Sequence, residues 1–441
     1  MFMKFVFIDP KGVWQGLNNG IAYIAAMIQN DVDQIHVIDF VNRSGQEDRR
    51  LEVVKDADVI GISFKSFTLV EGLRITEKVK KLNPKAKLIA GGPHIIVDGF
   101  NFMKENEIFD LAVAGEAEQT FKEIVDGKDY ASIAGLIYRD GVEVKQNPKR
   151  EWNMDLDALP FPTYDNFDSV NIDGVVKKID KWPLVTSRGC PYSCTYCNVP
   201  SVIGRRFRTR SGKNIMAELL YAREKYGSEE FKVLDDNFTL QMDRAKEICR
   251  LFLDEGLDMR WTCPNGIRAD RLDEELCMLM KEAGCYSVCL GVESGDPEVF
   301  AKINKGERLE DVERGIKLVQ GAGIQVHGFF IIGLVGSTAE TDKRSIEFAK
   351  RLGISASWGI LVPYPGTPVW AQVRSDPNVR MLRDWKEGFH IGARPKVVFD
   401  TPQYPADERV KMYFHANMST IKKRDIPRAA KMLIKSLVSG K

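Results

Sequence analysis

Short apolar runs rich in β-branched residues alternate with amphipathic segments along this chain, and this alternation most constrains its fold. The first such runs are "KFVFID" (Lys4–Asp9), "QIHVIDF", "ADVIGISF", "AKLIAGG" and "FDLAVAG". Helix-like segments such as Leu17–Asn30 and Leu69–Leu82 separate them. Continuous apolar strands with helices between them predict a doubly wound parallel sheet of the α/β class. Such sheets bind ligands beyond the carboxyl ends of their strands, and no G-x-G-x-x-G motif indicates a dinucleotide.

A second alternating series follows a hairpin-like segment (Gly135–Gln146, turning at Asp140-Gly141) and the Pro-punctuated segment Asn153–Phe167. Strands are expected at Pro183–Ser187, Phe231–Asp235, Met259–Cys263, Tyr286–Val292, Gln325–Ile332 and Trp358–Val362. Six βα units in about 180 residues predict a partial (β/α)6 barrel of the TIM type. The chemistry of such a barrel belongs at the carboxyl ends of its strands.

The charge balance argues against a polyanionic or membrane partner. The 441 residues include 63 basic and 62 acidic side chains, for a formal net charge of +1, so no global field recruits nucleic acid. No apolar run approaches the roughly 18–20 residues of a membrane span, and the start lacks the regions of a signal peptide. The eight cysteines form one tight trio and five scattered sites, which predicts a metal site in a reducing, cytoplasmic compartment.

Three cysteines, Cys190, Cys194 and Cys197, lie in "SRGCPYSCTYCN", directly after the first strand of the second series. Thiolates at C-x-x-x-C-x-x-C spacing on one loop suit three corners of a cubane [4Fe-4S] cluster, whose fourth iron stays open. A zinc site needs a fourth nearby ligand, and the nearest histidines, His94 and His327, are more than 90 residues away in the chain. Zinc and three buried structural cysteines are the two alternatives.

The segment "CPYSCTYC" resembles the signature C-x-x-x-C-x-aromatic-C of the radical S-adenosylmethionine (SAM) family. The resemblance implies that the cysteines hold a [4Fe-4S] cluster whose open iron is chelated by the amino and carboxylate groups of SAM. One electron from the cluster then cleaves SAM to methionine and a 5′-deoxyadenosyl radical. Later segments resemble the family's elements for the SAM amino group ("VLDDNFT"), the ribose ("LGVESGD") and the adenine ("HGFFIIGLVGSTAET").

By that resemblance, the residues expected at SAM are Tyr196, Asp235, Asp236, Arg268, Glu293, Ile331 and Gly333. Tyr196 is expected near the adenine, the two aspartates near the amino group, and Glu293 at the ribose hydroxyls. Arg268 is expected to pair with the SAM carboxylate or with Glu293, and a surface charge is its alternative. The adenine element departs from the family's G-L-P-G-E-T at Val335 and Ser337, so only backbone contacts are expected there.

The segments "AGGPHIIVDG" and "VAGEAEQTFKEIVDG" resemble the flavodoxin/Rossmann-like cobalamin (B12)-binding domain that precedes the radical SAM core in the B12-linked branch. The expected cobalamin contacts are Ser63, Lys65, Phe67, Gly91, Gly92 and Glu116. The chain lacks the D-x-H-x-x-G motif whose histidine ligates cobalt, and His94 is expected in a loop. The lower face of cobalt is therefore expected to carry no histidine, with Lys65 or Phe67 beside it. A solvated Lys65, and a sheet that binds nothing, are the alternatives.

Together these resemblances imply a class B, cobalamin-dependent radical SAM methyltransferase, in which methylcobalamin delivers a methyl group to an unactivated carbon of the substrate. One alternative uses the same cofactors for ring closure, oxidation or rearrangement. Another, from a different class, is a non-catalytic cobalamin carrier or sensor. A methylthiotransferase is disfavoured, since such enzymes usually carry three further amino-terminal cysteines. The expected partners are a small-molecule or peptidyl substrate and an electron donor such as flavodoxin or ferredoxin.

Three further residues are candidates for the substrate side. Tyr364, in "VPYPGTPVW", is expected to line the substrate cavity, and Cys263 and Cys289 are candidate hydrogen donors or redox partners, with packing as the alternative. The basic run Arg205–Arg210 predicts a solvated face or a contact with an acidic substrate group. The expected domains are the cobalamin-binding domain at 1–132, a hairpin and linker at 133–180, the radical SAM core at 181–365, and a small substrate-shaping region at 366–441.

Overall fold

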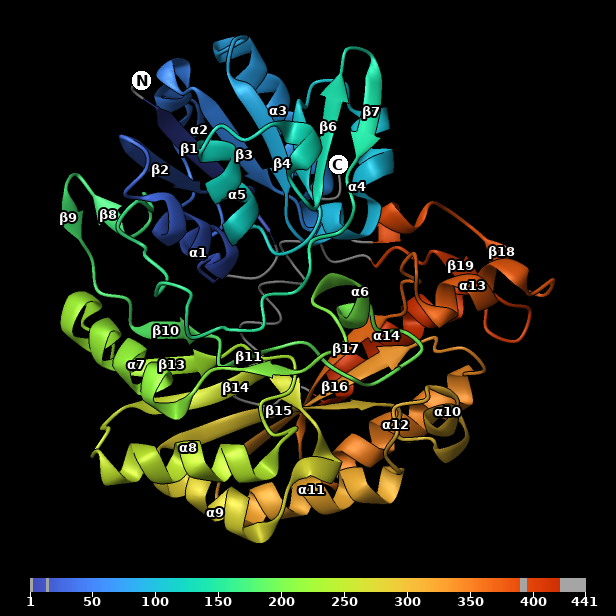
Figure 1. The fold of residues 1–441 in the computed structure, drawn as a ribbon. Coiled ribbons are helices and arrows are strands. Elements are labelled where there is room, and N and C mark those ends of the chain that lie inside the picture. The colour runs from blue at the N-terminus through green and yellow to red at the C-terminus, as the bar shows by residue number, and fades with distance from the viewer. Residues whose placement is uncertain (1–2, 13–15, 389–394, 421–441) are drawn as a thin grey trace. The chain divides into compact units, whose positions relative to one another are not determined.

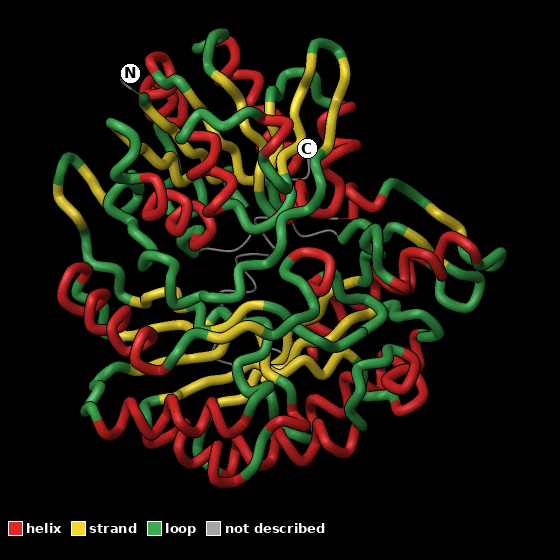
Figure 2. Tube along the Cα trace, viewed as in Figure 1, coloured by secondary structure: helices red, strands yellow, loops and turns green. Residues whose placement is uncertain are grey.

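The computed structural model describes residues 3–12, 16–388 and 395–420, and it divides into two compact units. The first unit comprises the described residues of Met1–Pro183, Ser201–Gly204 and Arg208–Ser228. The second comprises those of Leu184–Pro200, Arg205–Phe207 and Glu229–Lys441. Helices and strands alternate in both (Figure 2). Among the described residues, no helix is long and apolar enough to cross a membrane.

The first unit contains a seven-stranded sheet of order β2-β1-β3-β4-β5-β6-β7. Its parallel strands are β1 (Lys4–Asp9), β2 (Gln34–Asp39), β3 (Val59–Ser63), β4 (Lys87–Gly91) and β5 (Leu111–Val113). The predicted hairpin forms β6 (Leu136–Asp140) and β7 (Glu143–Gln146), which extend the sheet antiparallel. Because β2 and β3 flank β1 on opposite sides, the strand order reverses between β1 and β3. In sheets of this kind a ligand binds in the crevice outside the carboxyl ends of the two strands between which the order reverses, here β1 and β3.

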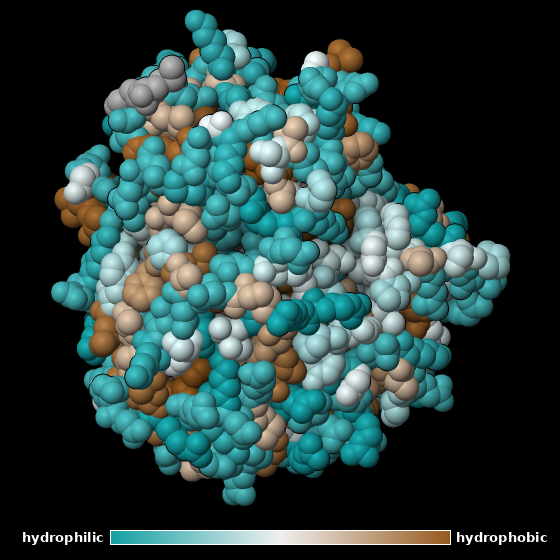
Figure 3. Space-filling model, in the orientation of Figure 1, coloured by the Kyte–Doolittle hydropathy of each residue, from teal (hydrophilic) through white to brown (hydrophobic). Residues whose placement is uncertain are grey.

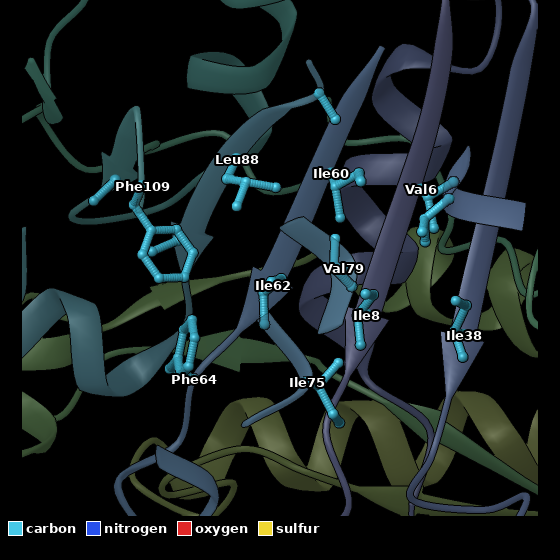
Figure 4. Packing of buried hydrophobic residues seen from close by; sticks show 14 of the residues in the cluster. Val6, Ile8, Ile38, Ile60, Ile62, Phe64, Ile75, Val79, Leu88 and Phe109 are labelled. Atoms are coloured by element: carbon cyan, nitrogen blue, oxygen red, sulfur yellow. The ribbon is translucent and has the colours of Figure 1, made fainter. Parts of the chain in front are cut away.

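Helices cover both faces of this sheet (Figure 1). They are α1 (Asn19–Ile28), α2 (Glu47–Leu51), α3 (Leu69–Leu82), α4 (Pro93–Glu105) and α5 (Glu118–Val125). The first unit also contains α7 (Gly212–Tyr226), from much later in the chain. On one face Ile8 and Ile62 pack with Ile75 and Val79 of α3, in the apolar cluster of Figure 4. On the other, the ring of Phe7 lies 5.4 Å from that of Phe121 on α5. Burial of each such side chain contributes about 1.5–3 kcal/mol.

The second unit is built on a six-stranded sheet whose spatial order, β10-β13-β14-β15-β16-β17, follows the chain. The strands are β10 (Lys181–Leu184), whose last residue begins the unit, β13 (Glu230–Val233), β14 (Arg260–Ile267), β15 (Cys285–Glu293), β16 (Gln325–Ile332) and β17 (Ser355–Ile360). The helices between them are α8 (Met242–Asp254), α9 (Glu274–Glu282), α10 (Pro297–Lys302), α11 (Leu309–Gly321) and α12 (Ala339–Arg351). Consecutive strands from β13 to β17 pair in parallel, as a partial βα barrel requires.

Several strands differ from the sequence prediction. β10 is Lys181–Leu184 rather than Pro183–Ser187, and β13 ends at Val233 rather than Asp235. β17 begins at Ser355, three residues before the predicted Trp358, because Ser355, Ala356 and Ser357 pair with His327–Phe329 of β16. β14 continues to Ile267, four residues past the predicted Cys263. Its Pro-Asn-Gly sequence is typical of a loop, but the pairing with β15 shifts register there and the strand continues through the irregularity.

The carboxyl-terminal region adds α13 (Pro368–Ser375), the short strands β18 (Arg380–Met381) and β19 (Phe399–Asp400), and α14 (Ala406–Thr420). α14 packs against α12 and β17, so this helix covers the last strand of the sheet. Parts of the expected substrate-shaping region, residues 389–394 and 421–441, lie outside the described residues. Hydrophilic side chains dominate the face drawn in Figure 3, and apolar ones are scattered over it.

Candidate functional site

The three signature cysteines lie on one loop after β11 (Ser187–Arg188), at the carboxyl end of the first strand of the second unit. All three are half-buried, and the Cys197 amide donates to the carbonyl of Cys194 (3.1 Å), which closes a turn. Burial, together with the charges of Cys194 and Cys190, raises the pKa of the Cys197 thiol to about 12. The three sulfurs are therefore neighbours that share one environment.

The spacing of these thiols on one loop fits a cluster. Three such thiolates suit a cubane, which takes one cysteine at each of three irons. A tetrahedral zinc site needs four converging ligands. The donor set thus fits the [4Fe-4S] cluster, and the residues that would hold it are Cys190, Cys194 and Cys197.

The two candidate aspartates after β13 have different surroundings. Asp235 is 3% exposed, and its carboxylate accepts from the Thr186 amide (2.6 Å), the Thr186 hydroxyl (2.5 Å) and the Ser187 hydroxyl (2.6 Å). It therefore fastens the strand that leads into the cysteine loop. Asp236 accepts from the Gly189 amide, and burial together with the charge of Asp235 raises its pKa to about 6. Asp236 therefore lies beside the cysteine loop but does not accept from Thr186 or Ser187, as Asp235 does.

Glu293 lies at the end of β15 and contacts the signature tyrosine. Its backbone has φ of 65°, a left-handed conformation that is uncommon outside glycine and found at functional sites. The Tyr196 hydroxyl is hydrogen-bonded to the Glu293 carboxylate. Burial raises the pKa of that carboxyl, while Lys305, whose Nζ lies 3.7 Å from Oε1, lowers it. Tyr196 and Glu293, separated by almost a hundred positions in sequence, are thus brought together as expected for one ligand site.

Lys305 and Glu307 belong to this site, and sequence reasoning missed both. The Lys305 side chain is 6% exposed, and its Nζ contacts Glu307 Oε1 (2.7 Å) and the carbonyl of Gly291. Its neighbour Asn304 donates to the carbonyl of Ser193 (3.4 Å), and the Thr195 amide donates to the Ile303 carbonyl (2.9 Å). The segment from Ile303 to Glu307 therefore underlies the cysteine loop. The only sequence signal was a charged, Gly-containing loop, "NKGER", between two helices.

Arg268 is in the site but does not bind Glu293. Its guanidinium donates to both oxygens of Asp270 (2.9 and 3.1 Å) and to the carbonyl of Lys305. It lies 3.5 Å from the ring centroid of Tyr192, inside the cysteine loop. With 7% of its side chain exposed, it is not a solvated surface charge either. Arg268 ties the cysteine loop to the segment after β14, and Lys305 is the cation beside Glu293.

At the adenine element, Ile331 is the penultimate residue of β16, and Gly333 follows the strand with φ of 76°. The Gly333 amide donates to Asp342 Oδ2 (3.2 Å), which also accepts from the Tyr404 hydroxyl (2.8 Å). A Cβ at Gly333 would approach Arg409 of α14 to 2.9 Å. Burial raises the pKa of Asp342 to about 7. The carboxyl-terminal helix thus packs directly beneath the expected SAM-binding turn.

The three candidates for the substrate side, Tyr364, Cys263 and Cys289, differ in how deeply they are buried. Tyr364 is half-buried, lies near Cys197 and packs against Trp385 (5.9 Å between ring centroids). Cys263 is 2% exposed, and burial holds the pKa of its thiol well above the usual range. Cys289 is half-buried and alternates along β15 with buried Val288 and Leu290, so it points to the sheet face opposite them. Of the two, Cys289 is placed to face the barrel interior.

In the first unit, Lys65 follows β3 and reaches the end of β1. Its Nζ lies 3.0 and 3.3 Å from the two oxygens of Asp9, which is 1% exposed. Burial raises the pKa of Asp9 and the ion pair with Lys65 lowers it. The pair spans β1 and β3, where the strand order reverses. Lys65 is therefore an ion-paired residue in the crevice, rather than a freely solvated lysine.

The backbone around this crevice is open. An added Cβ at Gly91, at the end of β4, or at Gly115, after β5, would meet no atom within 4 Å. Gly92 has φ of 94° and lies so close to Phe64 that a Cβ would approach its carbonyl oxygen to 2.7 Å. Ser63 accepts from the Asn18 side chain (3.2 Å). The open surroundings of Gly91 and Gly115 are compatible with a broad ligand such as cobalamin.

Glu116 and the basic run are joined by an ion pair, and two arginines of that run are buried. Glu116 binds Arg208 Nη1 with both carboxylate oxygens (2.8 Å each), and the Arg208 side chain is fully buried. Arg210 is also buried and pairs with Glu218 (2.5 Å), so these two arginines do not form a solvated face. Phe67 lies beside Gly12, where a Cβ would come within 2.9 Å of its ring.

His94 is a correction to the expected loop histidine. It is fully buried in the first turn of α4, with Nδ1 3.1 Å from the Ser66 hydroxyl. The cause is local: the His94 amide donates to the Phe64 carbonyl (3.0 Å), which draws the start of the helix beneath the loop after β3.

Both units match known families. Residues 5–125 match the model described as a B12 binding domain, and residues 184–366 match the Radical SAM superfamily. An uncharacterized methyltransferase of Pyrococcus horikoshii is 32% identical over 377 residues, covering 83% of this chain and 80% of that protein. The cytidylyl-2-hydroxyethylphosphonate methyltransferase of Streptomyces wedmorensis is 28% identical, covering 77% of this chain and 74% of its own length.

A more distant relative is the anaerobic magnesium-protoporphyrin IX monomethyl ester cyclase of Rubrivivax gelatinosus, 23% identical over 80% of this chain and 65% of its own length. Among solved structures, the radical SAM methyltransferase TsrM of Kitasatospora setae, with cobalamin and a [4Fe-4S] cluster bound, has the same fold. Its TM-score is 0.76 at 17% identity, covering 96% of this chain and 92% of TsrM. The chain therefore belongs to the B12-binding radical SAM enzymes, the family of the cobalamin-dependent radical SAM methyltransferases.

Proposed function

We propose that this enzyme uses a [4Fe-4S] cluster, SAM and cobalamin to methylate an unactivated carbon of a small-molecule or peptidyl substrate. The observation that carries the proposal is the cysteine loop with Tyr196, Glu293 and Lys305 gathered around it, in a chain that also has a B12-binding domain. When bound, the cluster and SAM supply a hydrogen-abstracting radical, and cobalamin supplies the methyl group.

The residues of the second unit bind and orient SAM. Tyr196 flanks the adenine, while Glu293 accepts hydrogen bonds from the ribose hydroxyls. Asp236 is the proposed acceptor for the SAM ammonium, because the Asp235 carboxylate is already bound to Thr186 and Ser187. Ile331 and Gly333 offer backbone groups to the adenine.

Lys305 keeps a positive charge beside Glu293, which a buried carboxylate needs if it is to stay ionised. An ionised Glu293 is the stronger hydrogen-bond acceptor for two hydroxyls. Arg268 acts by holding Tyr192 and the cysteine loop rather than by touching SAM.

The proposed cobalamin site of the first unit is bordered by the loop containing Ser63, Lys65 and Phe67 and by Gly91 and Gly92. Asp9 holds Lys65 in the crevice, so this ion pair would border cobalamin when it is bound. Glu116 contributes indirectly, by fixing Arg208.

On the substrate side, Tyr364 and Cys289 face the reaction space, and Cys263 serves packing. Residues 366–441 shape the entry for substrate, with residues 133–180 as the linker between the domains at 1–132 and 181–365. An electron-carrier protein in a reducing compartment, the cytoplasm, supplies the electron.

A second candidate is a B12-linked radical SAM reaction without net methylation, such as ring closure. It is favoured by one observation, the relative from Rubrivivax gelatinosus that is named a cyclase. That reaction would leave the same cysteine, Glu293 and Lys65 contacts in place.

The test uses anaerobically reconstituted enzyme with SAM and dithionite, with and without cobalamin, and quantifies 5′-deoxyadenosine and S-adenosylhomocysteine. Both products are expected from the wild type, and S-adenosylhomocysteine is expected only when cobalamin is present. The Cys194→Ala variant is expected to form neither product. Undiminished S-adenosylhomocysteine without cobalamin contradicts methyl transfer through B12. Deoxyadenosine alone, with cobalamin bound, favours the second candidate.

A further inference from the structure

The turn after β16 contacts an arginine of the carboxyl-terminal helix. α14 packs against β16 itself (Figure 1), and its Arg409 is 2% exposed. A Cβ added at Gly333 would lie 2.9 Å from Arg409 Nη1, 3.1 Å from its Cδ and 3.2 Å from its Cζ. With φ of 76°, Gly333 already has a conformation that favours glycine, and the close approach of the arginine requires glycine a second time. The guanidinium therefore lies directly against the backbone of this turn.

Arg409 is fixed in place by two residues of the carboxyl-terminal region, Phe399 and Tyr404. Its Nε donates to the Tyr404 carbonyl (3.1 Å), and its Nη1 donates to the Phe399 carbonyl (3.2 Å). Its Cζ lies 4.6 Å from the ring centroid of Phe399 and 5.1 Å from that of Tyr404. Directed hydrogen bonds and ring contacts together define both the position and the plane of a guanidinium. Arg409 thus presents a fixed surface to Gly333.

The amide of the same turn is fastened to the same region through Asp342. The Gly333 amide donates to Asp342 Oδ2 (3.2 Å), and the Tyr404 hydroxyl donates to that same oxygen (2.8 Å). Asp342 is 2% exposed and Tyr404 is fully buried. Gly333 is therefore held at its amide by Asp342 and at its Cα by Arg409, and Tyr404 contacts both of the residues that hold it.

The burial of Arg409 is costly, and packing alone does not account for it. In the described part of the chain no carboxylate forms an ion pair with Arg409, whose hydrogen bonds go to carbonyl oxygens. The charges of Asp342 and Asp400 stabilise it from a greater distance. An apolar side chain would anchor α14 without the cost of desolvating a cation. The contact with Gly333 gives the arginine a role that an apolar anchor would not fill.

We propose that Arg409 and Tyr404 are positioning residues for SAM, which fix the Gly333 turn in the conformation that receives the adenine. The inference rests on the proposed function, because it takes SAM to lie beside Ile331 and Gly333. Arg409 acts through the backbone of the turn and does not touch SAM. A turn that is already fixed binds its ligand without a further ordering cost, so loosening it weakens SAM binding. It leaves the cleavage rate of bound SAM unchanged.

The first test measures SAM binding to holoenzyme by equilibrium dialysis with labelled SAM. Arg409→Met is expected to bind SAM about tenfold more weakly, because the turn loses its support. Tyr404→Phe keeps the ring and loses only the hydroxyl at Asp342, so its affinity is expected to fall about threefold. The matched controls are Arg351→Met, an exposed arginine at the end of α12, and Tyr413→Phe on α14. Both controls are expected to keep the wild-type affinity.

Two further readouts separate positioning from a general loss of stability. In 5′-deoxyadenosine formation with dithionite, KM for SAM is expected to rise by the same factors, while kcat stays within about twofold of the wild type. Hydrogen–deuterium exchange of SAM-free holoenzyme reports on the turn itself. The peptide that contains Gly333 is expected to exchange faster in both variants, and the peptide from the middle of β16 is expected to keep its protection.

Three results overturn the proposal: unchanged SAM affinity in Arg409→Met, a lower kcat with unchanged KM, or the same loss of affinity in the controls. If Arg409→Met does not fold, unchanged affinity in Tyr404→Phe overturns it alone. Wild-type holoenzyme that binds no SAM contradicts the proposed function instead. The exchange measurement then decides whether Arg409 and Tyr404 hold the turn.

Discussion

At the scale of single residues, the site depends on buried charges that compensate one another. Glu293 and Glu307 are buried carboxylates, and Lys305, itself 6% exposed, contacts both. Removing one partner of a buried ion pair leaves an uncompensated charge, which costs about 3–5 kcal/mol. Lys305 is therefore a positioning residue: it acts on SAM through Glu293.

Lys305→Met is expected to weaken SAM binding at least about tenfold, because Glu293 then favours its protonated form and binds the ribose less well. Iron and sulfide content are expected to stay at the wild-type level, since no cysteine is changed. Equilibrium dialysis with labelled SAM measures the affinity. The control is Lys302→Met, an exposed lysine three residues earlier. Unchanged SAM affinity in Lys305→Met excludes the positioning role.

Asp235→Asn tests the anchor of the cysteine loop. The carboxylate accepts three hydrogen bonds, whereas the amide of asparagine places two donors where acceptors are needed. The variant is expected to retain less than about half of the wild-type iron and sulfide, because an unmade buried hydrogen bond costs roughly 1–3 kcal/mol and loosens the loop. Exposed Asp243→Asn on α8 is the control. Full iron content in Asp235→Asn contradicts the anchoring role.

At the scale of elements, the sequence predicted the bounds of those helices and strands whose apolar residues recur with a clear local period. The strand Gln325–Ile332 and the helix Leu69–Leu82 have the predicted bounds, because each has a clear period of apolar residues. β17 and β14 were misplaced where small residues or a Pro-Asn-Gly sequence continue a strand only because a neighbour pairs with them. The cysteines were evident from spacing, but Lys305 and Arg409 act through contacts between segments distant in sequence, which no local pattern reveals.

The junction of α12 with the carboxyl-terminal region is expected to respond to pH. Burial raises the pKa of Asp342 from 3.8 to about 7, so the folded state binds its proton more tightly than the unfolded state. Stability therefore falls as pH rises from about 4 to about 7, and it is level outside that window. Asp342→Asn mimics the protonated side chain and still accepts from Tyr404 and Gly333.

Hydrogen–deuterium exchange of the α14 peptide measures this, after correction for the intrinsic pH dependence of exchange. In the wild type, protection of Ala406–Thr420 is expected to fall between pH 5 and pH 8, and Asp342→Asn is expected to lose most of that fall. Equal slopes in the two proteins contradict a titration of Asp342.

At the scale of the whole molecule, the two units interleave along the chain. The cysteine loop belongs to the second unit, but the helix α7 that follows it belongs to the first. Glu218 on α7 is fully buried, and it accepts from Trp182 Nε1 (2.7 Å) and pairs with Arg210 (2.5 Å). This buried network fixes, within the first unit, the segments on either side of the loop.

Arg210→Met is expected to lower the free energy of unfolding of the first unit by about 3 kcal/mol, since it leaves Glu218 buried without its cation. Arg210→Met/Glu218→Leu is expected to recover most of that loss, because a well-packed apolar pair is tolerated where one unpaired charge is not. Circular dichroism melts of the full chain measure both, with exposed Arg223→Met on α7 as control. A double variant no more stable than Arg210→Met contradicts this account of the network.

The most direct test of the whole site is electron paramagnetic resonance of the dithionite-reduced enzyme, recorded with and without SAM. Three cysteines on one loop leave one iron of the cluster for SAM, and Glu293, Tyr196 and Lys305 hold SAM beside it. The spectrum of a reduced [4Fe-4S] cluster is therefore expected to change on addition of SAM in the wild type, and to change only at much higher SAM concentration in Lys305→Met. A spectrum that SAM leaves unchanged at saturating concentration contradicts an open iron at this loop.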